Sequence, residues 1–139
     1  MKPYEYFEHT ADVKFRAYGK NLDEAFSNVA LAFFNLVIDT NTVKPVVTKQ
    51  VQVSTSKKES LLFDFVDELV YLLSEGFLLH KVENLSITQK EDSYELSATL
   101  LMDDHKNYAT HGDIKAATYN DMLIEEKPDG VMIQMVVDV

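Results

Sequence analysis

The amino-acid sequence predicts an α+β fold, in which one or more mixed, mostly antiparallel sheets carry two amphipathic helices packed on them. Two segments have apolar residues at helical spacing, and several others alternate apolar and polar residues as strands do. The two patterns do not alternate regularly along the chain, which argues against the repeated βαβ units of a parallel sheet. The length of 139 residues suits a single domain, 1–139.

The first half of the chain predicts two strands, a helix and a third strand. Residues 4–9 and 13–19 have the short, alternating pattern of strands. Residues 21–38 carry one apolar face at helical spacing, and Asn21 is a suitable N-cap for that helix. Residues 49–56 alternate valine with glutamine, so they predict a third strand.

The middle of the chain holds the clearest helical pattern, over residues 56–80. Ser56 and Glu59 have the spacing of a capping box directly before the apolar run. A strand pair is then expected at 84–90 and 94–102.

The last third predicts two strands joined by a turn. Residues 113–126 are expected to form one long strand, and "KPDG" at 127–130 has proline and glycine in turn positions. The final strand, 131–139, is apolar on both faces, which is typical of a central, covered strand.

The composition excludes several classes of function. There are 13 basic and 23 acidic residues, which gives a net charge of -10. Direct binding to nucleic acid is therefore not expected, whereas binding to a basic partner or to a cation is expected. The sequence has no cysteine, which excludes disulfides and thiolate chemistry. It shows neither a signal peptide nor an apolar run of membrane-spanning length, so we expect a soluble, cytoplasmic protein.

Acidic groups lie near both ends of the sequence. Asp138 precedes the terminal carboxylate of Val139, and adjacent negative groups at a strand end favour a hard cation such as Ca²⁺ or Mg²⁺. Asp12, at the start of a strand, could complete such an oxygen site. The alternatives are a frayed, solvated terminus, and a turn held by Thr10 and Asp12 through side-chain to backbone hydrogen bonds.

Other candidate residues are weaker on pattern alone. His9 could be a ligand or a base, but a lone histidine is more often a hydrogen-bonded structural residue. Lys115 and Tyr119 would share a face of the expected strand, directed at a partner or a phosphate, although a solvated face is commoner. The chain has no P-loop, no G-x-G-x-x-G, no H-E-x-x-H and no G-x-S-x-G motif.

Three motifs together resemble the archease family. They are "EHTADV" at 8–13 followed by an amphipathic helix, "KAATYN" at 115–120, and a sequence ending "VDV" at 137–139. The resemblance runs from end to end, in order and at a fitting length. It implies a small α+β protein that acts with the RtcB-type RNA ligase in tRNA splicing. Such a protein promotes guanylylation of the ligase, allows multiple turnover and broadens its nucleotide use, without being an enzyme itself.

The resemblance also implies roles for single residues. The metal site of the family, usually described as calcium, corresponds here to Asp12, Asp138 and Val139, with Mg²⁺ as the other candidate ion. Lys115 corresponds to a position tied to activation of the partner, and we group Glu8 and His9 of the same motifs with it. Two positions depart from the family: Glu8 stands where aspartate is common, and Asn120 where histidine is frequent.

Two other functions are compatible with the residues. One is a small divalent-metal-dependent phosphoester hydrolase that uses His9, Asp12 and Asp138. The other is a chaperone-like binding protein with an exposed apolar patch. The identity of the ion and the oligomeric state are left open by the sequence.

Overall fold

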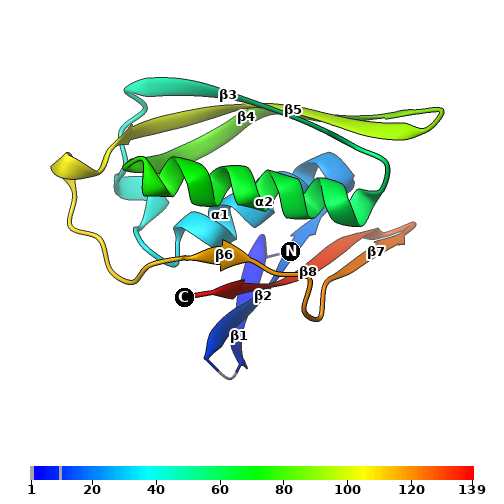
Figure 1. The fold of residues 1–139 in the computed structure, drawn as a ribbon, viewed down its shortest axis with the longest axis horizontal. Coiled ribbons are helices and arrows are strands. Elements are labelled where there is room, and N and C mark those ends of the chain that lie inside the picture. Colours follow the sequence, from blue (N-terminus) through cyan, green and yellow to red (C-terminus); the bar gives the residue numbers. More distant parts are fainter. Residues whose placement is uncertain (1, 10) are drawn as a thin grey trace.

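The protein forms two antiparallel sheets with two helices between them (Figure 1). The structure, a computed structural model, describes residues 2–9 and 11–139, with His9 described by its backbone alone. Every strand pair in it is antiparallel. The predicted α+β class, with two helices packed on mostly antiparallel sheet, is confirmed, and the sheet is divided into two that enclose the helices.

The larger sheet has the order β1-β2-β8, and two further strands, β6 and β7, both pair with β8. The smaller sheet has the order β3-β5-β4. The elements are β1 (Tyr4–His9), β2 (Asp12–Gly19), α1 (Leu22–Phe34), β3 (Val47–Thr55), α2 (Lys58–Ser74), β4 (Phe77–Lys90), β5 (Ser93–Asp104), β6 (Ala116–Ala117), β7 (Leu123–Lys127) and β8 (Gly130–Asp138), with single 3-10 turns at Thr40–Thr42 and His105–Asn107.

Helix α1 begins as the sequence predicts. The side chain of Asn21 accepts a hydrogen bond from the backbone N–H of Glu24 (2.9 Å), which satisfies one of the donors left open at a helix start. The helix ends before the predicted residue 38. The side-chain amide of Asn35 donates to the carbonyl of Leu31 (2.8 Å) and thereby caps the last turn.

Helix α2 is shorter than predicted at both ends. The predicted Ser56–Glu59 capping box is absent, because the N-cap is Lys57 and no side chain caps the first turn. The predicted continuation to residue 80 is also wrong. Gly76 adopts a left-handed backbone (φ +90°), which ends the helix and lets β4 begin directly after it. In the described part of the chain, neither α1 nor α2 is long and apolar enough to cross a membrane.

The long strand predicted at 113–126 is wrong. Two short strands, β6 and β7, lie along β8 with a turn between them. The turn is held from β8: the hydroxyl of Thr118 donates to the carbonyl of Val136, and the amide of Gln134 donates to the carbonyl of Asp121, both at 2.8 Å. Asp121 has a left-handed backbone (φ +52°), which a continuous strand cannot accommodate.

The core lies between the two sheets, around the helices. Strand β8 is central, as predicted, because β2 covers one edge and β6 and β7 the other. Its buried apolar side chains include Ile133, Met135 and Val137. The helices and β2 contribute the largest fully buried rings, Phe15, Phe26, Phe33, Phe34 and Phe65.

Candidate functional site

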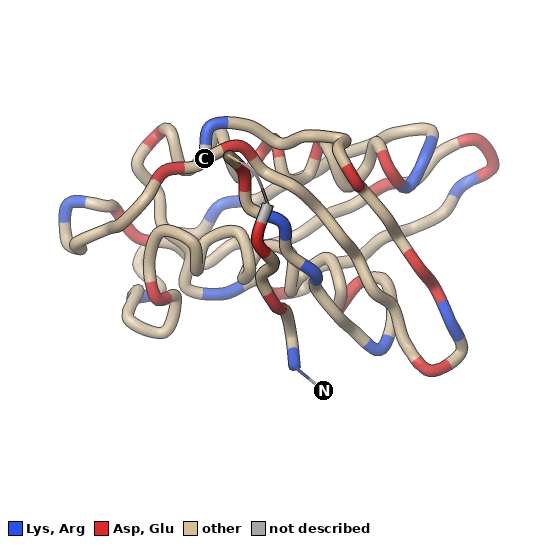
Figure 2. The backbone as a smooth tube through the Cα atoms, turned by 90° about the horizontal axis from the view of Figure 1, so that it is seen from below, with Lys and Arg blue, Asp and Glu red and all other residues tan. Residues whose placement is uncertain are grey.

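The two acidic residues from opposite ends of the sequence meet in the larger sheet. Strand β2 begins at Asp12 and β8 ends at Asp138, and the antiparallel register places their Cα atoms opposite each other. Figure 2 shows the C-terminal end of the chain beside the start of β2.

The alternation of β2 decides which way Asp12 faces. Phe15 and Ala17 are fully buried against the helices, so the residues of opposite parity, including Asp12 and Lys14, face outward. The register gives Asp138 the same face, because Val137 is buried beside Val13. Packing of the core therefore places both carboxylates on the outer side of the sheet.

The two carboxylates interact directly. A hydrogen bond with Asp12 raises the pKa of Asp138 above its ordinary value, and desolvation and the negative charge of Asp12 act in the same direction. The charge of Lys115 opposes this shift and lowers the pKa of Asp138. A hydrogen-bonded carboxylate pair is destabilised when both groups are ionised, so a proton or a cation between them is favourable.

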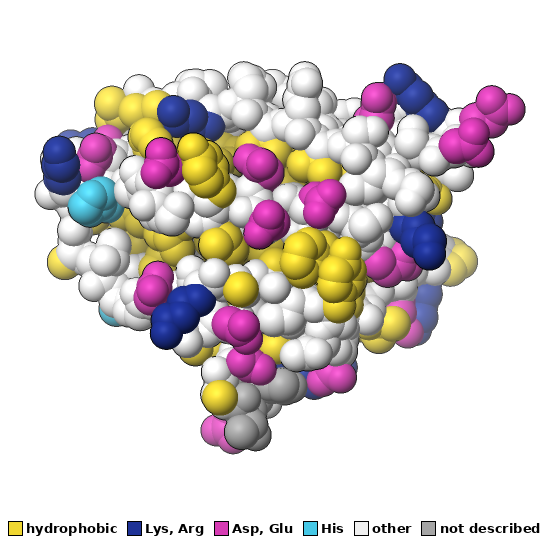
Figure 3. All heavy atoms as spheres, in the orientation of Figure 1, with side chains coloured by type: hydrophobic (Ala, Val, Ile, Leu, Met, Phe, Trp, Pro, Cys, Tyr) yellow, Lys and Arg dark blue, Asp and Glu magenta, His cyan; other side chains and the backbone are white. Residues whose placement is uncertain are grey.

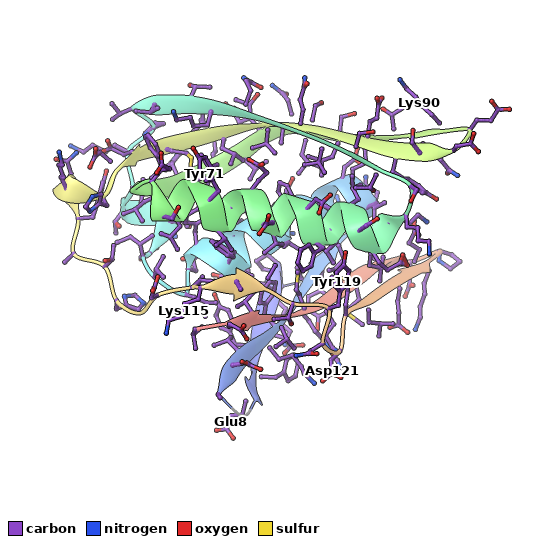
Figure 4. The ribbon with its side chains drawn as sticks, in the orientation of Figure 1. Glu8, Tyr71, Lys90, Lys115, Tyr119 and Asp121 are labelled. Atoms are coloured by element: carbon purple, nitrogen blue, oxygen red, sulfur yellow. The ribbon has the colours of Figure 1, made fainter. Side chains whose placement is uncertain are left out.

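Lys115 is attached to this pair through the backbone. Its N–H donates to the carbonyl of Asp138 (2.8 Å), and the next residue, Ala116, pairs with Asp138 in the sheet. The Lys115 side chain is exposed at the start of β6 (Figure 4). A cationic side chain therefore stands next to the carboxylate pair.

The predicted shared face of Lys115 and Tyr119 does not form. Strand β6 covers only Ala116–Ala117, and the chain turns away after it. Tyr119 instead stacks on Phe63 of α2, with ring centroids 4.3 Å apart and planes at 6°, and remains 55% exposed.

Glu8 is not brought together with the carboxylate pair. It pairs with Val13, and this register gives it the opposite face of the sheet from Asp12. Figure 4 shows Glu8 at the far end of the β1–β2 hairpin, away from Lys115. The Cα of His9 lies opposite that of Asp12. The predicted roles of the His9 side chain and of a turn held by Thr10 lie outside the described residues.

The donor set suits a hard cation, but it is small. Among residues 2–8 and 11–139, no three His, Asp or Glu side chains group together as metal ligands. Asp12 and Asp138 form a pair, and the carboxylate of Val139, on the neighbouring residue, would be the third donor. All of these donors are oxygens, as Ca²⁺ and Mg²⁺ prefer.

The sequence analysis did not predict the residues that hold the structure next to the carboxylate pair. Lys14, two residues along β2 from Asp12, makes an ion pair with Asp121 (3.2 Å). Gln134 is 8% exposed and holds the turn that carries Asp121. Gln134 is a single amide within the apolar run of β8, and a buried amide needs hydrogen-bond partners. Its position could therefore have indicated that a neighbouring segment is held there.

Fold and site together define a small α+β protein whose first hairpin and last strand join in an acidic pair flanked by a lysine. The profile of the Archease protein family (MTH1598/TM1083) matches residues 4–139. The chain belongs to the archease family, as the motifs predict.

Relatives match along the whole chain. The protein archease of Methanosarcina acetivorans is 39% identical over 99% of this chain and 97% of its own length. That of Pyrococcus abyssi is 37% identical over the full length of both. The solution structure of Methanobacterium thermoautotrophicum protein 1598 has a TM-score of 0.86 at 29% identity, with both chains fully covered. The crystal structure of an archease, possible chaperone, from Thermotoga maritima shares the fold, with a TM-score of 0.62 at 18% identity over 96% of this chain and 94% of the other.

Proposed function

We propose that this chain is a non-catalytic activator of an RtcB-type RNA ligase in tRNA splicing. It promotes guanylylation of the ligase, supports multiple turnover and broadens the nucleotides that the ligase uses. The observation that carries the proposal is the hydrogen-bonded pair of Asp12 and Asp138 beside Lys115. Membership of the archease family supports it, since the same positions carry the resemblance.

The carboxylate pair is suited to hold a divalent cation. Asp12, Asp138 and the carboxylate of Val139 would bind it, with Ca²⁺ expected and Mg²⁺ as the alternative. When bound, such a cation supplies positive charge that can neutralise phosphate oxygens. The exposed Lys115, whose charge acts on Asp138, adds a second positive charge near the pair.

The residues act by position and charge. Transfer of a nucleotidyl group depends on fixed positive charge next to phosphate oxygens, so an aligned lysine beside a carboxylate-held cation is an effective arrangement. The β2–β8 ladder and the Lys115 to Asp138 hydrogen bond fix the backbones of both groups before the partner arrives. The net charge of -10 on this chain would repel RNA. In this proposal the ligase binds the RNA, so this chain need not do so.

The test is a guanylylation assay with an RtcB-type ligase from the same source, GTP and Mn²⁺, with this chain at substoichiometric amounts. We expect a catalytic rise in guanylylated ligase, abolished in Asp138→Asn and in Lys115→Met. Asp92→Asn, at the exposed turn between β4 and β5, is the matched control and should activate like the native chain. No rise with a ligase that is active by itself would contradict the proposal.

A negative result would direct attention to two other functions. A hydrolase would turn over phosphoesters alone with Mg²⁺, Mn²⁺ or Ca²⁺. A chaperone-like protein would suppress the aggregation of a model client, and the exposed rings of Tyr71 and Tyr119 are the surface that it would use. Activity of the native chain in either screen, without effect on the ligase, would replace the activator function.

A further inference from the structure

The outward side of α2 carries exposed aromatic rings among acidic side chains. Figure 3, in the orientation of Figure 1, shows hydrophobic and acidic side chains next to one another over this helix. We call this surface the α2 face. It consists of the exposed residues Glu59, Asp64, Asp67, Glu68, Tyr71 and Glu75, together with the ring of Tyr119 stacked on Phe63.

The α2 face exposes two tyrosine rings to solvent. Tyr71 is 57% exposed and Tyr119 is 55% exposed, which places both among the most exposed large hydrophobic residues of the described chain. The stack on Phe63 fixes the Tyr119 ring, so little side-chain freedom remains to be lost on binding. Tyrosines are enriched at protein–protein interfaces, and arginine is enriched there as well.

The acidic part lacks compensating charge. Within the described residues, Asp64, Asp67 and Glu68 have no lysine or arginine within 4 Å, whereas Glu5, Glu83, Glu95, Asp121 and Glu126 each pair with a lysine. Asp64 stands three and four residues before Asp67 and Glu68, a spacing at which like charges on a helix repel. The last turn of α2 has no basic residue, although the helix dipole favours one there.

Charge complementarity selects the occupant of this face. A second copy of this chain would bring the same acidic face and be repelled. Nucleic acid and anionic membranes are disfavoured for the same reason at a net charge of -10. A protein surface rich in arginine and lysine fits both parts, since guanidinium groups stack on tyrosine rings and pair with carboxylates.

The α2 face adjoins the candidate site. Helix α2 packs on β6 and β7, and β6 carries Ala116, the partner of Asp138 in the sheet. In Figure 4, Tyr119 and Lys115 both lie below α2, one on either side of β6. The carboxylate pair faces the outer side of the larger sheet, so a protein that covers the α2 face contacts the pair by extending past β6 at the edge of that sheet.

We propose that the α2 face is the docking surface for the basic rim of the RNA-binding groove of the ligase. This inference rests on the proposed function. An RNA ligase must present lysine and arginine side chains to hold RNA phosphates, so it carries the surface that this face would recognise. Docking there supplies affinity and the association rate, whereas the carboxylate pair and Lys115 act on the nucleotide.

The test compares two triple variants with equal loss of charge. The first is Asp64→Asn with Asp67→Asn and Glu68→Gln on the α2 face. The control is Glu91→Gln with Asp92→Asn and Asp129→Asn, which lie on exposed turns elsewhere. Binding to the ligase is measured by titration calorimetry over a salt series, and activation by the guanylylation assay over a range of concentrations. Circular dichroism confirms that each variant is folded.

We expect the α2 triple variant to raise Kd for the ligase by about tenfold or more and to reduce the salt dependence of Kd. At saturating concentration it should still activate like the native chain. The control triple should bind nearly as the native chain does. Equal Kd values for both triple variants, in a system where the native chain activates, would overturn this inference and leave the proposed function intact. A native chain that neither binds nor activates the ligase would overturn both.

Discussion

The carboxyl groups of Asp12 and Asp138 lie opposite each other across β2 and β8 and share a hydrogen bond. The pKa of Asp138 is consequently raised from its ordinary value of 3.8. At pH values between 3.8 and the raised pKa, Asp138 binds more protons in the native protein than in the unfolded chain. The metal-free protein therefore loses stability as the pH rises through this window.

This gives a prediction for Asp138→Asn in the presence of EDTA. The amide cannot ionise, so at pH 7 it removes the repulsion between two carboxylates, and the variant should melt at a higher temperature than the native chain. The difference in Tm should shrink as the pH falls toward 3.8, where Asp138 of the native chain becomes protonated. Calorimetric melting curves between pH 3.5 and 7.5, with Asp129→Asn as the control, would measure it; a difference independent of pH would contradict the shared proton.

Addition of a divalent cation should make the native chain melt at a higher temperature than Asp138→Asn. A cation that binds only the native state raises Tm by mass action, by an amount that grows with its concentration above Kd. We expect Ca²⁺ to raise the Tm of the native chain and to leave Asp12→Asn and Asp138→Asn unchanged. Asp92→Asn should respond as the native chain does. Equal responses of all four proteins would show that any bound Ca²⁺ lies elsewhere.

The fold class was predictable because the core residues repeat with clear periods. The alternation around Phe15 and the apolar run that contains Ile133 predicted β2 and a central β8, and burial confirms both. The meeting of Asp12 with Asp138 was not derivable from pattern alone. It depends on β2 and β8 being neighbours, a long-range pairing that no local signal specifies. Acidic residues at two strand ends made a shared site possible, and the motifs of the family suggested it.

The errors of prediction lie where side chains far apart in the sequence override local pattern. The strand expected at 113–126 is broken because Gln134 and the carbonyl of Val136, both in β8, hold the turn. The helix expected to continue to residue 80 stops at a left-handed glycine, Gly76, and the apolar residues 77–79 that follow it gave no sign of a strand. Apolar runs of this kind fit either element, so pairing partners decide between them.

The start of each helix offers a matched stability test. Asn21→Ala removes the hydrogen bond from the Glu24 N–H to the Asn21 side chain and should lower the free energy of unfolding by about 1 kcal/mol. Ser56→Ala removes a side chain that caps no described N–H of α2, so a change within about 0.5 kcal/mol is expected. Urea unfolding of both variants measures the two values. Equal losses would mean that Ser56 caps α2 after all.

The junction between β2 and α1 provides the last prediction. A Cβ atom added to Gly19 would lie 2.3 Å from the backbone nitrogen of Ala25 and 2.8 Å from the carbonyl carbon of Glu24. These are backbone atoms of the first turn of α1, which cannot rotate away as the end of a side chain can. Gly19→Ala should therefore push α1 off the sheet and cost about 2 kcal/mol or more of the free energy of unfolding. Lys20→Ala, at the exposed next position, is the control and should stay near native. Urea unfolding decides the matter: a Gly19→Ala variant as stable as the control would mean that α1 does not approach β2 this closely.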